Sequence, residues 1–91
     1  MEDFLNELGI QGDFYDSKDG SKIMDIKDSN EYGKIYSKLD KTDLVYELED
    51  SSQITLDNSS IQYQSDNYVI TLIADFSQDI YKLTIREIFV R

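Results

Sequence analysis

The chain has 91 residues, enough for one domain (residues 1–91) with a single small hydrophobic core. Nineteen acidic against nine basic residues give a formal net charge of −10, and a hydrophobic fraction of 40% is too high for a disordered acidic tail. The absence of histidine and cysteine excludes disulfides, Ser-His-Asp and Cys-His catalysis and the usual zinc sites.

The first predicted element is a short helix over residues 1–8. Its apolar residues, Phe4, Leu5 and Leu8, fall on one stripe, and Gly9 is a typical helix stop. Residues 12–20 are rich in glycine and aspartate, which predicts a loop with a short extended piece near Phe14. Residues 22–27 then predict a short strand at the periphery of a sheet.

Residues 28–41 carry the clearest helical pattern. An apolar stripe recurs at i, i+3, i+4 and i+7, and its members are Tyr32, Ile35, Tyr36 and Leu39. Asp28, followed three residues later by Glu31, predicts an N-cap, and Ser29 is the alternative cap. We therefore expect the main helix over about residues 29–40, with its stripe against a sheet.

From Asp43 onward the hydrophobic period changes from 3.6 to 2, which predicts strands. The alternating runs are 44–48, 53–57 and 60–64. The predicted turns are 50–52, 58–59 and 65–66. In the first run we expect one set of residues on the buried face and the other on the open face, namely Leu44, Tyr46 and Leu48 against Val45, Glu47 and Glu49.

The stretch 68–90 predicts a long antiparallel hairpin, with a short polar link at Ser77 and Gln78. Alternation places on its buried face Tyr68, Ile70, Leu72, Ala74, Phe76, Tyr81, Leu83, Ile85 and Phe89. The fold class is therefore α+β, with an antiparallel sheet of about four to five strands covered on one face by the main helix and joined by a short N-terminal helix. The other face is expected to be mostly polar, apart from Val69 and Ile73.

The acidic loop at residues 13–20 resembles a calcium loop only superficially. Aligning Gly20 with the glycine of an EF-hand puts Tyr15 at the first ligand position and Ile26 at the twelfth, where acids are required. The chain also lacks the glycine-rich phosphate-binding motifs. We therefore expect no catalytic residues, no metal site, no cofactor and no enzymatic activity.

The charge is uneven along the chain. Residues 1–50 hold fourteen acidic and six basic residues, net −8, whereas residues 51–91 hold five and three, net −2. The electrostatic field of this negative charge repels nucleic acids and anionic membranes and attracts basic partners. No apolar run approaches the roughly 20 residues that span a bilayer, and the acidic start is unlike a secretory leader, so we expect a soluble, cytoplasmic protein.

Acids and aromatics of the first half are the candidate partner-binding residues. Tyr32, Tyr36, Tyr46 and Tyr68 are expected mainly in the core, whereas Phe14 and Tyr15 are expected to be exposed. Glu47 and Glu49 are two apart on a strand, hence about 6.6 to 6.8 Å apart on one face, a spacing similar to that of neighbouring phosphates. The candidate site comprises Asp13, Phe14, Tyr15, Asp16, Asp19, Asp40, Asp43, Glu47, Glu49 and Asp50.

These features favour a small acidic protein-binding inhibitor that mimics nucleic acid and blocks a basic groove on a nuclease or defence enzyme. The composition is similar to that of small phage proteins of the anti-CRISPR and anti-restriction type, and to that of immunity proteins paired with toxic nucleases, although no motif ties the chain to either. The expected partner is a larger basic protein. The alternative is an adaptor or a homo-oligomerising module, for example a homodimer, with no inhibitory role.

Overall fold

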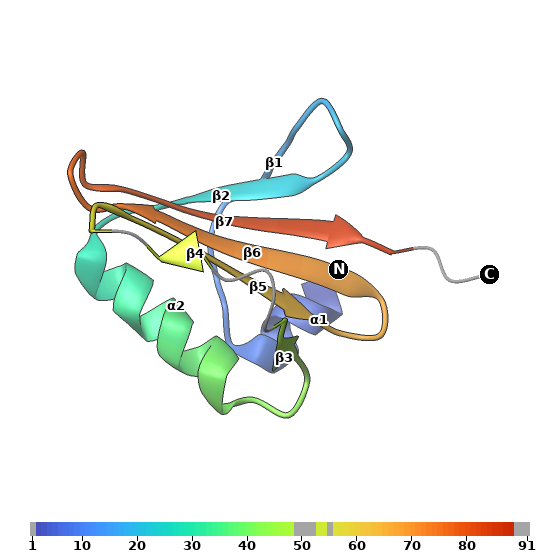
Figure 1. Ribbon diagram of the computed structural model, residues 1–91. Helices are drawn as coiled ribbons and strands as arrows, with labels where there is room; N and C mark the ends of the chain where they lie inside the picture. The colour runs from blue at the N-terminus through green and yellow to red at the C-terminus, as the bar shows by residue number, and fades with distance from the viewer. Residues whose placement is uncertain (1, 49–52, 55, 89–91) are drawn as a thin grey trace.

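The computed structural model describes residues 2–48, 53–54 and 56–88, and within them it is an α+β fold (Figure 1). One antiparallel sheet lies over two helices, both on the same side of the sheet. The helices are α1 (Glu2–Leu8) and α2 (Ser29–Lys41). The strands assigned in the described residues are β1 (Tyr15–Asp16), β2 (Lys22–Ile26), β3 (Tyr46–Glu47), β4 (Gln53–Ile54), β5 (Asn58–Gln64), β6 (Tyr68–Asp75) and β7 (Ile80–Glu87).

The sheet has the order β1-β2-β7-β6-β5-β3, with β4 also paired to β5. The predicted C-terminal hairpin is confirmed, since β6 and β7 pair from Tyr68 opposite Glu87 to Asp75 opposite Ile80. Phe76, expected on the buried face, is 48% exposed in the turn after β6, so that expectation is wrong. Phe89 lies outside the described residues. The strand count in the described residues exceeds the expected four to five because of three two-residue strands, β1, β3 and β4.

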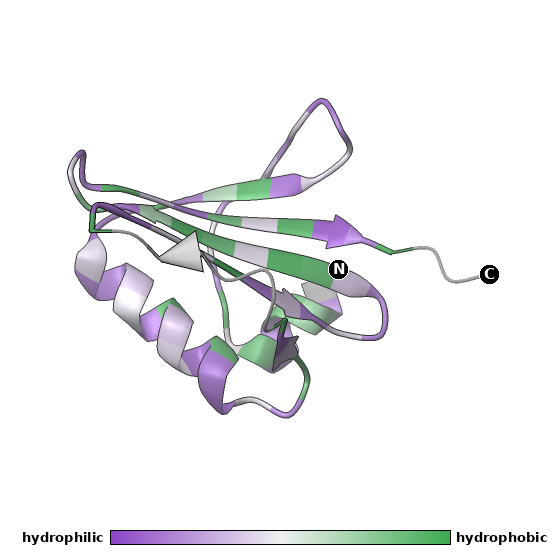
Figure 2. Ribbon diagram, in the orientation of Figure 1, coloured by the Kyte–Doolittle hydropathy of each residue, from purple (hydrophilic) through white to green (hydrophobic). Residues whose placement is uncertain are grey.

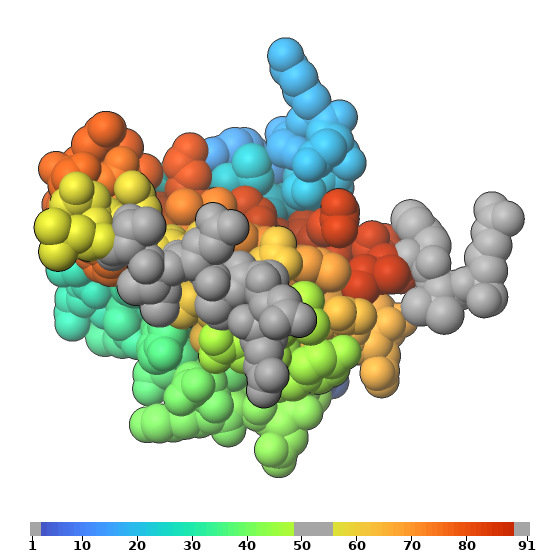
Figure 3. Space-filling model, in the orientation of Figure 1, coloured from blue at the N-terminus to red at the C-terminus, as the bar shows by residue number. Residues whose placement is uncertain are grey.

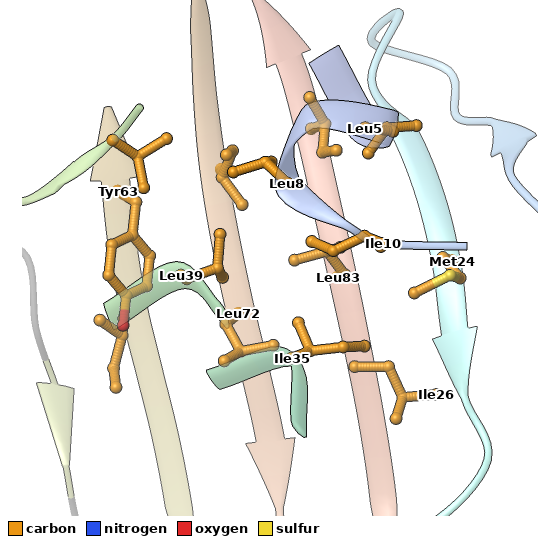
Figure 4. Packing of buried hydrophobic residues seen from close by; sticks show 14 of the residues in the cluster. Leu5, Leu8, Ile10, Met24, Ile26, Ile35, Leu39, Tyr63, Leu72 and Leu83 are labelled. Atoms are coloured by element: carbon orange, nitrogen blue, oxygen red, sulfur yellow. The ribbon is translucent and has the colours of Figure 1, made fainter. Parts of the chain in front are cut away.

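The buried face of the sheet packs against the helices (Figure 4). Ile70, Leu72, Leu83 and Ile85 are fully enclosed in this core. Figure 2 shows hydrophobic residues concentrated on β6 and β7 and mainly hydrophilic residues on α2. Burial of these side chains is the main source of stability in a chain of this size.

The predicted helices are confirmed, with α2 capped by Asp28. The Asp28 carboxylate accepts a hydrogen bond from the Glu31 N–H at 2.9 Å, which satisfies one of the free donors of the first turn. Ile35 and Leu39 of the predicted stripe are buried, whereas Tyr36 is 37% exposed. The expectation that Tyr36 covers the sheet is therefore wrong.

The N-terminal helix α1 ends at Gly9, whose φ of 74° favours glycine. Leu5 and Leu8 are buried beneath the sheet, and the ring of Phe4 stacks on that of Tyr68 with centroids 4.5 Å apart. The short helix is thus held by packing, which an isolated helix of two turns requires.

The predicted phase of residues 44–48 is wrong. Tyr46 pairs with Gln64 on the open face of the sheet, and Glu47 pairs with Tyr63 on the helix side. Accordingly Val45 is buried, whereas Tyr46 is 59% exposed and Leu44 is also exposed. The strand is only two residues long, so its packing beside α2 decides which residues face inward.

Two further predictions from residues 53–64 need correction. Asn58 and Ser59, expected in a turn, belong to β5 and pair with Asp75 and Ala74. Leu56, expected within a strand, is 95% exposed next to the bend at Asp57. The predicted turn at 50–52 lies outside the described residues.

The strand at residues 22–26 is confirmed but is less peripheral than expected. β2 pairs with β7 over five residues, and β1 pairs with its other side. Met24 and Ile26 are buried on its inner face. In the part of the chain that the structure describes, no helix is long and apolar enough to cross a membrane.

Candidate functional site

The structure divides the predicted site residues between two edges of the sheet. The first group, from Asp13 to Asp19, lies around β1 at one edge. The second group, from Asp40 to Glu47, lies at the end of α2 and on β3, the opposite edge. Glu49 and Asp50 lie outside the described residues. The two groups therefore do not form one continuous acidic surface.

Most acids of the first group have local partners. Asp16 pairs with Lys22, and the Asp19 carboxylate accepts hydrogen bonds from the Ser17 hydroxyl and, at 2.9 Å, from the Ser21 N–H. These bonds, the Ser17 hydroxyl first, lower the pKa of Asp19 from 3.8 to about 2. Asp19 thus organises the β1–β2 turn.

The aromatics of this loop behave differently from each other. Tyr15 is exposed, as expected, and its hydroxyl donates to the Asp25 carboxylate at 3.4 Å. Phe14, also expected to be exposed, is partly buried and packs against the core. The expectation for Phe14 is therefore wrong, because an apolar ring in a loop that crosses the core gains more from packing than from exposure.

The second group forms what we call the α2–β3 surface, made of Tyr36, Asp40, Asp43, Leu44, Tyr46 and Glu47. All six side chains are exposed, and α2 and β3 are in contact. Figure 3 shows the end of α2 and the following segment together at the lower corner of the molecule. Large apolar side chains and carboxylates therefore lie around one edge of the sheet, with Tyr46 on the open face and Glu47 on the helix side. Lys38 and Lys41 are the basic residues of the last turn of α2.

Asp40 and Asp43 stand in electrostatically unfavourable positions. Asp40 is in the last turn of α2, which ends at Lys41, and Asp43 follows two residues later. The C-terminal end of a helix carries a partial negative charge that disfavours carboxylates. Within the described residues, neither Asp40 nor Asp43 forms an ion pair. Helix stability therefore does not explain why acids occupy these positions.

Tyr63 of β5 lies directly behind this surface. Its side chain is buried, and its hydroxyl has no hydrogen-bond partner within the described part of the chain. Burial raises the pKa of Tyr63, and the nearby Tyr36, Glu47 and Asp40 raise it further. These three side chains, from α2 and β3, thus lie around one buried phenol.

Sequence reasoning found the acids of this surface but missed its apolar half. Tyr36 and Tyr46 were expected in the core, and Leu44 on the buried face. Both alternating sets of residues in the run 44–48 contain apolar side chains. The period of 2 alone therefore could not show which set faces the core. The predicted row of Glu47 and Glu49 stays a prediction, because Glu49 lies outside the described residues. Glu47 itself lies on the helix side of the sheet and not on the open face.

The α2–β3 surface consists of carboxylates, two phenols and one aliphatic side chain. Among the described residues, no cluster of three or more acidic side chains is placed to hold a metal ion. Comparison of the chain with family models, with curated proteins and with solved structures gives no match. Function must therefore be argued from the chemistry of the surface itself.

Proposed function

We propose that this chain is a non-enzymatic binding protein whose α2–β3 surface occupies a basic, nucleic-acid-binding groove of a larger protein and thereby inhibits it. The observation that carries the proposal is the combination on this surface of carboxylates that α2 does not need with exposed Tyr36, Leu44 and Tyr46. Acids supply the attraction to a basic groove, and tyrosines supply large, stiff contact area.

Each component has a separate energetic role. Asp40, Asp43 and Glu47 speed encounter with a positive surface, an effect that salt screens over about 8 to 10 Å near physiological ionic strength. Tyr36 and Tyr46 lose little conformational entropy on binding because each side chain has few rotatable bonds. The carboxylates would stand where phosphates of a nucleic acid otherwise bind, so binding and inhibition follow from the same contacts.

A pull-down from cells of the native host tests this function. The bait variant changes the three acids of the surface, with Asp40→Asn, Asp43→Asn and Glu47→Gln. The matched control makes the same three types of change away from this surface, with Asp57→Asn and Asp75→Asn at the opposite end of β5 and β6 and Glu87→Gln on β7. We expect the wild type and the control to retain a basic nucleic-acid-binding protein that the surface variant loses.

The retained protein should elute as NaCl rises, and its nucleic acid should compete with the wild-type chain in a gel-shift assay. Equal retention by both triple variants would show that the α2–β3 surface is not the contact. Retention that is independent of salt would show that charge does not drive the association. Either outcome contradicts the proposal.

A second candidate function is self-association through the open face of the sheet. Ile73 and Ile80 are exposed there, Val69 is half-buried, and Lys82 partly balances Asp25 on the same face. A like-charged copy is repelled least by such a face. Light scattering at micromolar concentration separates the two: a dimer that Ile73→Lys dissociates would favour self-association, and a monomer would favour the first proposal.

A further inference from the structure

The outer side of β2 is only partly covered by its neighbour. β2 runs from Lys22 to Ile26, but β1 pairs only with Lys22 and Ile23. Beyond that point, Met24, Asp25 and Ile26 have β7 on one side and, in the described part of the chain, no strand on the other. Figure 1 shows β1 beside one end of β2. Open strand edges bind other extended chains.

The backbone of Asp25 points toward this open edge. Across the β1–β2 turn, the Ser17 N–H donates to the Ser21 carbonyl at 2.9 Å, so the polar groups of Ser21 face β1. In an antiparallel ladder these groups alternate in direction, so those of Ile23 and Asp25 face the same way as those of Ser21. Within the described residues, nothing bonds to the Asp25 N–H and C=O on that side.

A hollow of about 470 Å³ adjoins this edge. Its floor is made by the buried side chains of Met24, Ile26 and Ile35, which Figure 4 shows on the helix side of the sheet. One wall is the backbone at Gly12, so close that a Cβ there would lie 2.0 Å from the Met24 sulfur. The hollow thus offers an apolar floor beside an unpaired stretch of strand.

Acidic residues outnumber basic ones along the hollow. Asp13, Asp25 and Glu31 line it, against Lys27 as the cation among the lining residues. Asp25 and Glu31 also contact Lys82 at 4.0 Å and Lys34 at 3.3 Å, but both pairs are exposed and such pairs contribute little. An incoming cation can therefore replace these lysines, and a basic segment matches the rim.

We propose that the outer edge of β2 binds an extended basic segment of a protein partner as an added antiparallel strand. A residue paired with Asp25 exchanges both backbone hydrogen bonds with it, and its side chain projects on the same face as the Asp25 carboxylate. A lysine or arginine fits there. The residues before and after it face the floor of Met24 and Ile26, so they are apolar. The preferred motif is apolar–basic–apolar.

This proposal is independent of the function proposed above, since β2 and β3 lie near opposite edges of the sheet. It is tested with the peptide acetyl-Ser-Val-Lys-Val-amide, which ends opposite Met24 and so leaves the pairing of Ile23 with Tyr15 intact, titrated into the ¹⁵N-labelled full chain and followed by NMR. We expect chemical-shift changes centred on the amides of residues 23–27, with affinity in the millimolar range typical of short peptides. Changes centred elsewhere, or none, would overturn the proposal.

Backbone methylation of the peptide separates strand addition from charge attraction. N-methylation of the lysine removes the N–H that points at the Asp25 carbonyl, so binding should weaken more than ten-fold. N-methylation of both valines removes N–H groups that point away from β2, so binding should change less than two-fold. Equal effects of the two modifications would rule out an added strand in this register.

Two protein variants test the charge. Asp25→Asn should weaken binding by about two- to five-fold, the range of a cross-strand ion pair, whereas Asp57→Asn, an equal charge change elsewhere, should leave it unchanged. If the two variants bound the peptide with equal affinity, the lysine of the peptide would not lie opposite Asp25. If the amides of residues 23–27 shift on dilution without peptide, a second copy of this chain occupies the edge, and the proposal is overturned.

Discussion

The β6–β7 hairpin and the α2–β3 surface belong to one fold but use their side chains in opposite ways. The two hairpin strands pair over eight residues, and Leu72 and Leu83, opposite each other, are fully buried. β3 is a two-residue strand, and the six side chains of the α2–β3 surface are all exposed. The hairpin therefore contributes most to the stability of the fold, whereas the exposed side chains of the α2–β3 surface contribute little to it.

This difference teaches where function is to be sought. In the hairpin, β-branched residues, alternation and burial all agree, as expected of residues selected for stability. At the end of α2, Asp40 and Asp43 oppose the helix dipole, and Tyr46 exposes an aromatic ring. Residue types that contradict their local environment are candidates for binding.

The largest expected effect is on the hairpin core. Leu83→Ala removes a fully buried side chain that lies between Leu72 and Met24 in the sheet register. We expect a loss of about 2 to 5 kcal/mol in the free energy of unfolding, measured by urea denaturation. The control, Ile73→Ala on the open face of β6, should cost about 1 kcal/mol or less. Similar losses for both variants would contradict the assigned core.

The next effect concerns the other end of α2. Asp28→Ala removes the N-cap that accepts the Glu31 N–H, which should cost about 1 kcal/mol of stability in the same urea assay. Asp28→Asn retains the acceptor and should recover most of this loss, because asparagine caps helices as well as aspartate does. An asparagine variant as unstable as the alanine variant would indicate that charge, not capping, is responsible.

The hairpin and α2 could be predicted from the sequence because each is long enough for its period to fix a face. Eight-residue strands with one apolar side allow a single register, since a slip of one residue would expose the core. The cap at Asp28 is a local signal that needs no tertiary information. These elements account for the α+β class and for most of the core.

The rest could not be predicted because local signals there are weak or are overruled. Asn58 and Ser59 are typical turn residues, yet pairing with β6 draws them into β5, where Ser59 is buried opposite Ala74. In the run 44–48, Val45 turns inward because it joins the buried cluster that contains Leu39 and Tyr63, which the pattern along the chain does not reveal. The division of the predicted acids between two edges depends on strand order, which a pattern along the chain does not contain.

Tyr63 is a core residue behind the α2–β3 surface, and its hydroxyl tests whether this part of the core is bonded to the surface. Tyr63→Phe removes a buried hydroxyl that has no partner in the described residues while keeping the ring. Because an unpaired buried hydroxyl costs free energy, the variant should be as stable as the wild type or more stable by up to about 1 kcal/mol. A clear loss of stability would show that the hydroxyl is bonded.

Alkaline pH sharpens the same test. Since burial raises the pKa of Tyr63 above its ordinary value of 10, its proton is lost from the unfolded chain first. The Tyr63 contribution to stability is therefore fully present below pH 10 and is lost as pH rises above it. Tyr63→Phe should reduce the decline in unfolding free energy above pH 10. An unchanged decline would mean that other groups, such as Tyr81, whose pKa is also raised, are responsible.

The smallest expected effect on stability, and the one that most separates the two regions, comes from the acids at the C-terminal end of α2. The double variant Asp40→Asn, Asp43→Asn removes two carboxylates from the negative end of the helix dipole and relieves their mutual repulsion. We expect the free energy of unfolding to rise by about 0.3 to 1 kcal/mol at low ionic strength, and the gain to shrink in 1 M NaCl, where the Debye length is about 3 Å. The same variant should bind its basic partner more weakly. A gain in stability together with a loss of binding is the combination expected of residues kept for recognition. A loss of stability would instead assign Asp40 and Asp43 to the fold, and the contrast between the α2–β3 surface and the hairpin would no longer hold.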